Sequence, residues 1–219
     1  MTGEKHGTTA SRPRVTRDHV RISTASGPPV ALVLAGPNGA GKTTSSRLLV
    51  PAGSVFLNAD DFAAQLVAAG HRPAGLDVAA GRALLGELRR LVDAGEPFCL
   101  ETNLTGRGLV RSISAWRRAG YRISLAFIAL QSPELAVARV ATRVALGGHD
   151  VPEAVVRRRW QAGLEALFDV YIEAVDEWRL MDNSDDLAVV VARGGRLAGT
   201  EILDRTRWSH LHGLAKGSL

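Results

Sequence analysis

The sequence is poor in features that several classes of protein need. Among its 219 residues there is a single cysteine, Cys99, so no intramolecular disulfide can form and a reducing compartment is expected. No apolar run approaches the roughly 18 residues that span a bilayer. The basic N-terminal stretch has no apolar segment after it, which argues against a secretory signal. We therefore expect a cytoplasmic protein without a membrane partner.

The folded body also lacks an excess of charge. The net charge is +5, but residues 1–28 hold five Lys/Arg against two Asp/Glu, and residues 201–219 hold three against two. A nucleic-acid-binding protein is expected to carry a basic face on its body, so this distribution argues against a nucleic-acid partner. We expect residues 1–28 to be a flexible basic tail, 29–200 a single domain, and 201–219 a C-terminal tail or helix.

Lysine is the scarcest charged residue, with three lysines against 24 arginines. Lys5 and Lys216 lie near the ends, so Lys42 is the only lysine of the body. It belongs to "GPNGAGKT", residues 36–43, which matches the pattern G-x-x-x-x-G-K-[ST] between an apolar run and a helix-like run.

Each residue type in this pattern suits the binding of a triphosphate. Glycines let backbone N–H groups turn around a phosphate chain, and the following helix directs its positive end at the anion. Lys42 would reach the β- and γ-phosphates, and the Thr43 hydroxyl would bind Mg²⁺. We predict a site for ATP or GTP with Mg²⁺ that is formed by Gly36, Pro37, Asn38, Gly39, Ala40, Gly41, Lys42, Thr43 and Thr44.

Apolar runs alternate with helix-like segments along the body, which predicts βα units and a mainly parallel sheet of an α/β protein. Strands are expected at 30–34, 54–58, 98–102, 123–130 and 187–192, with another short one at 177–181. Helices are expected at 42–50, 60–69, 77–94, 108–119, 133–146 and 152–176. The helix at 77–94 has one apolar stripe, formed by Val78, Leu84, Leu85, Leu88, Leu91 and Val92.

Acidic and amide residues follow two of the predicted strands. Asp60 and Asp61 end "FLNADDF", and Glu101 and Asn103 end "FCLETN". The carboxyl ends of parallel strands face the ligand crevice, so these side chains should lie near the phosphates. Asp60 is our candidate catalytic base, with helix capping as the alternative role. Asp61, Glu101 and Asn103 are candidate substrate contacts, with Glu101 also a candidate for Mg²⁺ through water or for a structural hydrogen bond.

An arginine-rich helix–loop–helix, residues 143–160, follows the fourth predicted strand and is expected to form a small lid. Arg139 and Arg143 lie four residues apart on one helix face, and arginine matches phosphate oxygens well. We predict that Arg143 is catalytic and that Arg139 binds the nucleotide. The three arginines at 157–159 point in directions about 100° apart and cannot all face one ligand.

The ordered set "GPNGAGKTT", "NADDF", "ETNLTGRG", "GGHDVP", "RRRW" and "MDNS" resembles the zeta toxin family of P-loop kinases over residues 30–193, and "GGHDVP" resembles a chromosomal-type subgroup. The resemblance implies a three-layer P-loop kinase fold with a five- to six-stranded sheet of order 2-3-1-4-5. It implies phosphoryl transfer from ATP or GTP to a UDP-amino sugar such as UDP-N-acetylglucosamine, and a small antitoxin as a candidate partner.

Other functions of the same phosphate loop remain open. A transporter-type ATPase is disfavoured because no apolar strand ends in Asp-Glu and no "LSGGQ" signature is present. A kinase acting on an antibiotic, a nucleoside or a polynucleotide end would use the same donor chemistry. A non-catalytic nucleotide-binding module that regulates a partner through its basic tail is the alternative outside enzymes.

Overall fold

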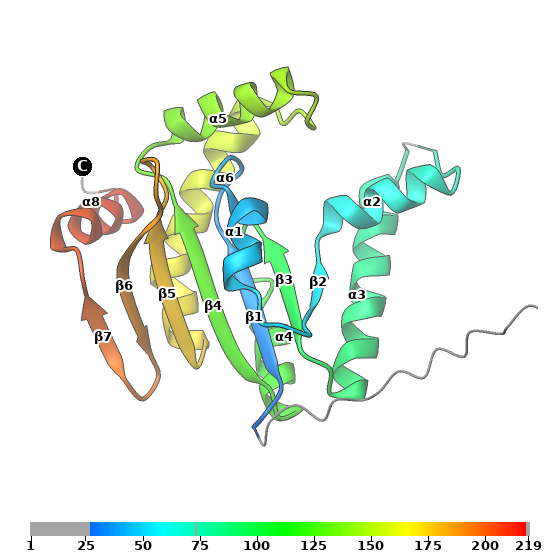
Figure 1. Ribbon diagram of the computed structural model, residues 1–219, viewed down its shortest axis with the longest axis horizontal. Helices are drawn as coiled ribbons and strands as arrows, with labels where there is room; N and C mark the ends of the chain where they lie inside the picture. The colour runs from blue at the N-terminus through cyan, green and yellow to red at the C-terminus, as the bar shows by residue number, and fades with distance from the viewer. Residues whose placement is uncertain (1–26, 73, 218–219) are drawn as a thin grey trace, which may run out of the picture.

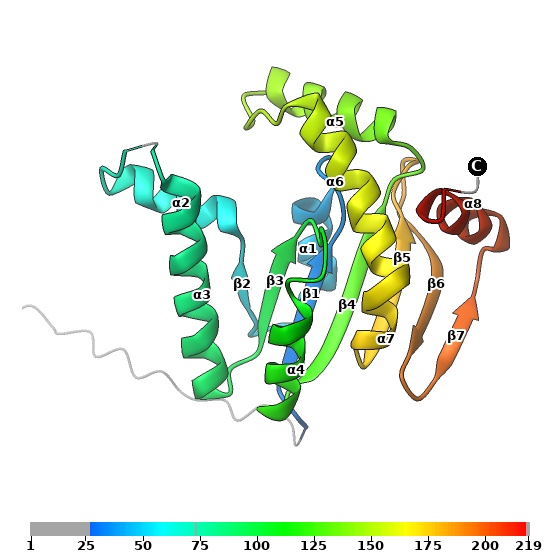
Figure 2. The same ribbon diagram turned by 180° about the vertical axis from the view of Figure 1, so that it is seen from behind.

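The computed structural model describes residues 27–72 and 74–217 as a seven-stranded sheet with helices on both faces (Figures 1 and 2). The strand order is β2-β3-β1-β4-β5-β6-β7. The first five strands of this order are parallel, β6 pairs antiparallel with β5, and β7 pairs antiparallel with β6. The strands are β1 (Val30–Ala35), β2 (Val55–Leu57), β3 (Phe98–Thr102), β4 (Arg122–Ala129), β5 (Glu177–Asp182), β6 (Val189–Gly195) and β7 (Gly199–Ile202).

The helices cover both faces of the sheet and one of its ends. α4 and α6 cover one face of the sheet, seen in front in Figure 2, while α1 lies on the other, and α5 runs across the carboxyl ends of the strands. α2 and α3 pack against each other beside β2. The helices are α1 (Lys42–Leu49), α2 (Ala59–Ala68), α3 (Leu76–Ala94), α4 (Val110–Arg118), α5 (Pro133–Ala145), α6 (Glu153–Ala166), α7 (Ile172–Ala174) and α8 (Arg205–Ala215).

The central strands form the core because they are apolar on both faces. Residues 31–35 of β1 are all buried, as are residues 125–129 of β4. Such continuous apolar runs are typical of parallel strands that helices cover on both sides. Trp160 of α6 packs into this core and donates a hydrogen bond from Nε1 to the Leu130 carbonyl at 3.0 Å. The sheet therefore holds β1 and the loop that follows it rigidly.

The α/β fold and the strand order 2-3-1-4-5 agree with the prediction, but two details differ. The sheet has seven strands rather than five or six, because the short polar segment 199–202 pairs with β6 and adds an unpredicted edge strand. The predicted helix 152–176 is interrupted by a π-helix, η1 (Leu167–Tyr171), before α7. Periodicity does not distinguish a π-turn from the α-helix around it, since only the hydrogen-bond pattern changes.

Residues 1–26 of the predicted N-terminal tail lie outside the described residues. None of the helices in the described ranges combines the length and hydropathy that crossing a bilayer requires.

Candidate active site

The loop that links β1 to α1, residues 36–43, has the backbone shape of a phosphate-binding loop and is called the phosphate loop below. Gly36 has φ 141°, and a Cβ there would lie 2.2 Å from the Ile128 carbonyl oxygen of β4. Gly41 has φ 82°, and a Cβ there would lie 2.8 Å from Asn183 Nδ2. Glycine is required at both positions because a side chain would be strained and would collide with a neighbour. The loop is thus pressed against the carboxyl ends of the sheet.

Lys42, the first residue of α1, is buried within this loop. Its exposed fraction is 8%, and Nζ donates to the carbonyls of Gly36 at 2.8 Å and Pro37 at 3.0 Å. Nζ also donates to Asn103 Oδ1 at 3.3 Å and lies 4.0 Å from a Glu101 carboxylate oxygen. The ends of β3 and β1 therefore converge on one ammonium group, as the sequence predicted for parallel neighbours.

Burial disfavours the charged forms of both Lys42 and Glu101. It lowers the pKa of Lys42 to about 8, although the negative charges of Glu101 and Asp60 act to raise that pKa. It also raises the pKa of Glu101, with Lys42 as the main opposing influence. Desolvation therefore outweighs mutual attraction for both partners. An anion that adds negative charge beside Lys42 would offset its burial cost.

This shift predicts a pH dependence of nucleotide binding. Above its pKa, Lys42 must take up a proton to hold a phosphate, so affinity for a purine triphosphate should be about tenfold weaker at about pH 9 than at about pH 7.5. Calorimetric titration at both pH values measures the difference. Lys42→Arg, whose charge does not titrate in this range, serves as the control and should show no such dependence if it still binds. Equal wild-type affinity at both values would contradict the prediction.

The same shift has a consequence for the stability of the ligand-free protein. Between about pH 8 and the ordinary lysine pKa of 10.5, the unfolded chain binds more protons at Lys42 than the folded chain does. Stability from this group should therefore rise with pH across that window.

Thr43 and Glu101 provide oxygen atoms suited to Mg²⁺. Thr43 Oγ1 donates to Glu101 Oε2 at 3.2 Å, at the mouth of the phosphate loop. Mg²⁺ prefers hard oxygen ligands and is often held by one or two protein groups together with substrate phosphates. A threonine hydroxyl with a half-buried carboxylate beside it fits that ion, so these two residues are the ones that would hold it.

Asp60 lies in the first turn of α2, and the structure excludes the alternative that it caps the helix. The N-cap is Asn58, whose Oδ1 accepts the Asp60 backbone N–H at 2.9 Å. The Asp60 carboxylate is exposed and belongs to the wall of the cleft, whereas Asp61 is exposed outside that wall. Asp60 is therefore free to contact a substrate, and Asp61 is placed less favourably than the sequence suggested.

Most of the predicted residues meet in one cleft of about 590 Å³, a volume typical of ligand sites. Gly36, Pro37, Ala40 and Asp61 are not part of its wall, although the first three shape the phosphate loop from behind. From the predicted set, the wall contains Asn38, Gly39, Gly41, Lys42, Thr43, Thr44, Asp60, Glu101, Asn103, Arg139 and Arg143. A larger hollow of about 780 Å³ lies at the opposite edge of the sheet, beside the β6–β7 hairpin, and contains none of them.

The arginines of the predicted lid differ in what they contact. Arg143 lines the cleft and donates from Nη2 to the His149 carbonyl at 2.9 Å. Arg159, which sequence reasoning did not single out, donates from Nη1 to Asn38 Oδ1 of the phosphate loop at 3.2 Å. Arg157 instead pairs with Glu134 and Glu153. The spacing of three consecutive arginines shows that they diverge, but only the fold shows which one turns toward the loop.

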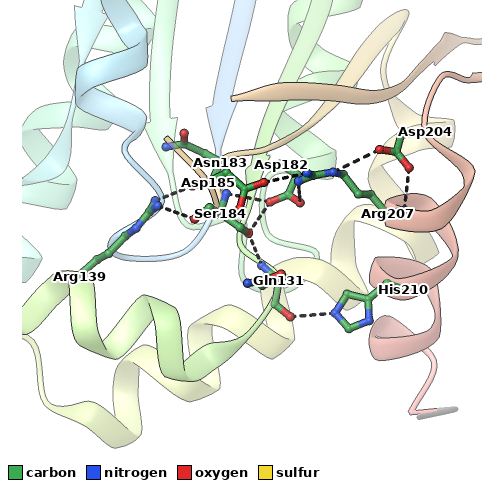
Figure 3. Close-up of polar contacts among 9 residues, drawn as sticks. All are labelled: Gln131, Arg139, Asp182, Asn183, Ser184, Asp185, Asp204, Arg207 and His210. Carbon is green, nitrogen blue, oxygen red and sulfur yellow. Dashed lines mark hydrogen bonds and ion pairs between the residues drawn. The ribbon is translucent and has the colours of Figure 1, made fainter. Parts of the chain in front are cut away.

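Arg139 holds the segment after β5 rather than pointing only into the cleft. Its Nη1 and Nη2 donate to the carbonyls of Asn183 at 2.6 Å and Ser184 at 3.0 Å (Figure 3). Asn183 Nδ2 in turn donates to the Ala40 carbonyl at 2.9 Å, within the phosphate loop. The segment "MDNS" thus braces the phosphate loop, a role that sequence analysis missed because the contact spans 143 residues.

The same segment is fixed from its other side by the C-terminal helix. Asp182 is buried, and its Oδ2 accepts from Arg207 Nη1 of α8 at 2.6 Å (Figure 3). Arg207 also contacts Asp185 at 2.8 Å and Asp204 at 3.2 Å. A chain of polar contacts therefore runs from α8 through the end of β5 to the phosphate loop.

Asp182→Ala is expected to lower the free energy of unfolding by about 2 kcal/mol, because the Ser184 N–H and hydroxyl lose their acceptor and Arg207 loses the buried one of its three carboxylate partners. Urea denaturation followed by circular dichroism measures the change. Glu201→Ala removes an exposed pair with Arg193 and is the matched control, with an expected effect within about 0.5 kcal/mol. Equal losses in the two variants would contradict a structural role for the buried pair.

The fold and this geometry define a P-loop protein with a mixed α/β architecture, which is consistent with a P-loop kinase fold. Residues 32–167 match the AAA_33 family, described as an AAA domain, and the chain belongs to that family. A Haemophilus influenzae protein described as uncharacterized is 28% identical over 130 residues, which are 59% of this chain and 91% of that protein.

Solved structures with the same fold include two chains that belong to complexes. A chain of the AvrRxo1-ORF1:AvrRxo1-ORF2 complex has a TM-score of 0.67 and 20% identity, over 84% of this chain and 63% of that chain. The present chain therefore spans less than two thirds of it. A chain from the PezAT chromosomal toxin–antitoxin system of Streptococcus pneumoniae has a TM-score of 0.63 and 20% identity, over 91% of this chain and 83% of that one. The resemblance to zeta-toxin-like P-loop kinases is thus confirmed at the level of the fold.

Proposed function

We propose that this protein is a cytoplasmic small-molecule kinase that transfers the γ-phosphoryl group of ATP or GTP to a hydroxyl group. The observation that carries the proposal is the convergence in one cleft of a buried phosphate-loop lysine, a hydroxyl–carboxylate pair suited to Mg²⁺, and an exposed carboxylate at the far side. A structure of the AvrRxo1-ORF1:ORF2 complex with ATP supports a purine triphosphate as the donor.

Each residue has a defined task in this reaction. Lys42, Arg143 and Arg159 would neutralise charge on the transferring phosphoryl group, and the backbone of the phosphate loop would hold the β- and γ-phosphates. Asp60 would align the acceptor hydroxyl for in-line attack and accept its proton, while Glu101 and Asn103 contact substrate or hold Lys42. Mg²⁺, when bound by Thr43 and Glu101, supplies further neutralisation of phosphate charge.

The resemblance to zeta toxins makes UDP-N-acetylglucosamine the first acceptor to test, and a small antitoxin the first protein partner. The PezAT system is a toxin–antitoxin pair, and the AvrRxo1 chain was solved with its own partner. If this chain is a toxin, its expression should arrest bacterial growth, and Lys42→Ala should abolish the arrest. Growth arrest by the inactive variant would assign toxicity to something other than phosphoryl transfer.

The activity is tested with γ-labelled ATP, UDP-sugars and a cell extract, followed by mass spectrometry of the products. Label in an organic product supports a kinase. Label that appears only in free phosphate would contradict it and favour the reading as a regulatory ATPase. Calorimetry with Mg²⁺ and ATP or GTP provides a second check, because a folded protein that binds neither cannot have this function.

A further inference from the structure

The two sides of the cleft have opposite electrostatic character. All of its arginine and lysine residues lie on the donor side, where the phosphate loop and α5 supply Lys42, Arg139 and Arg143. The other side, here called the acceptor wall, is formed by Asp60, Leu84, Leu85, Leu88, Leu109 and Ser112. Across the described ranges 27–72 and 74–217, no lysine or arginine contributes to this wall.

The leucines of the acceptor wall come from the apolar stripe of α3. Leu88 is buried and belongs to the core, whereas Leu84 is half-buried and Leu85 has an exposed fraction of 62%. Helical spacing alone favours burial of the whole stripe. The structure instead leaves Leu84 and Leu85 open to the cleft, where their apolar surface can contact a ligand.

The charge near this wall is negative. Asp60 is part of it, and Glu101, whose carboxylate lies 4.0 Å from Lys42 Nζ, lines the same cleft. The arginines nearest in sequence are exposed and do not line the cleft; they are Arg82 and Arg89 on α3, Arg107 in the loop before α4, and Arg111 on α4. An anionic group placed here would meet like charges without a cation to pair with.

We propose that the acceptor is a neutral or cationic hydroxyl compound with an apolar face, and not a nucleoside-diphosphate sugar. The inference rests on the proposed kinase activity. It departs from the acceptor that the family resemblance implies, since a diphosphate group would need cations that the acceptor wall lacks. Leu84 and Leu85 contact the apolar face, Ser112 offers a hydrogen bond, and Asp60 takes the hydroxyl proton.

The test separates candidate acceptors by charge. A cell extract is passed over an anion exchanger at neutral pH, and the flow-through, the retained fraction and pure UDP-N-acetylglucosamine are each incubated with enzyme and γ-labelled ATP. Labelled organic product should form from the flow-through, which holds neutral and cationic compounds. Product formed mainly from the retained fraction or from the UDP-sugar would overturn the acceptor class while leaving kinase activity intact. Label only in free phosphate from all three would overturn both proposals.

Variants test the wall itself with the acceptor found in the flow-through. Leu85→Ala should raise the KM for that acceptor about tenfold and leave the KM for ATP unchanged. Leu48→Ala on α1, a leucine that is also exposed but lies outside the cleft, is the control and should change neither. Arg111→Ala should also leave the acceptor KM unchanged. A rise with Arg111→Ala, or no change with Leu85→Ala, would show that the proposed wall does not bind the acceptor.

Discussion

Asp60→Asn should lower the rate constant of phosphoryl transfer by about a thousandfold, within the range that a general base typically contributes. The amide has nearly the same shape as the carboxylate but cannot accept the proton of the acceptor hydroxyl. The fold should be preserved, because the helix cap is Asn58 and the Asp60 side chain is exposed. Nucleotide affinity should stay close to that of the wild type, since the phosphate loop is untouched. Single-turnover kinetics and calorimetry measure the two quantities.

The adjacent residue gives a closely matched control. Asp61 has the same charge and lies in the same helical turn, but it is not part of the cleft wall. Asp61→Asn should therefore transfer phosphate at nearly the wild-type rate. Similar losses in the two variants would point to the summed charge of α2 rather than to a base, and a wild-type rate for Asp60→Asn would remove Asp60 from the mechanism.

Lys42→Met should reduce kcat/KM for ATP by about a thousandfold or more, because it removes the only lysine of the body and the only ammonium in the cleft wall. The stability of the folded protein, in contrast to its activity, should not decrease. Burial disfavours the charged form of Lys42, so a neutral side chain of similar length should leave the thermal midpoint unchanged or higher. A large loss of activity without loss of stability would identify a residue kept for binding.

Lys216→Met is the control for this variant. Lys216 is an exposed residue that pairs with Asp169 on the surface, so its replacement should change neither activity nor the thermal midpoint appreciably. Differential scanning calorimetry and steady-state kinetics on both variants make the comparison. If Lys42→Met unfolded the protein, the lysine would be a structural element of the loop and the assignment of its role would fail.

The sequence predicted the elements whose signals are local. The phosphate loop was recognisable because glycine positions, the lysine and the hydroxyl all fall within eight residues between an apolar strand and a helix. The central strands were recognisable because burial on both faces leaves uninterrupted apolar runs. The order of the first five strands came from the resemblance to a known family, since spacing within a chain does not rank parallel strands across a sheet.

The tertiary structure decided matters that depend on contacts between distant segments. Arg159 was indistinguishable from Arg157 and Arg158 in sequence, and its contact with Asn38 exists only because α6 packs beside the phosphate loop. Asn58 rather than Asp60 caps α2, because the chain is still extended at Asn58 and the helix begins at the next residue.

The largest differences concern α3 and α8. The leucines of α3 form one apolar stripe in the sequence, but only the fold shows that Leu88 is buried while Leu85 is exposed in the cleft. Arg207 and Asp182 are 25 residues apart in sequence and join the C-terminal helix to the loop that braces the phosphate site. The sequence thus predicted where this protein would hold a phosphate, because that chemistry is encoded in one short segment. The surroundings of the site were decided by packing, because they are assembled from side chains that meet only when the chain has folded.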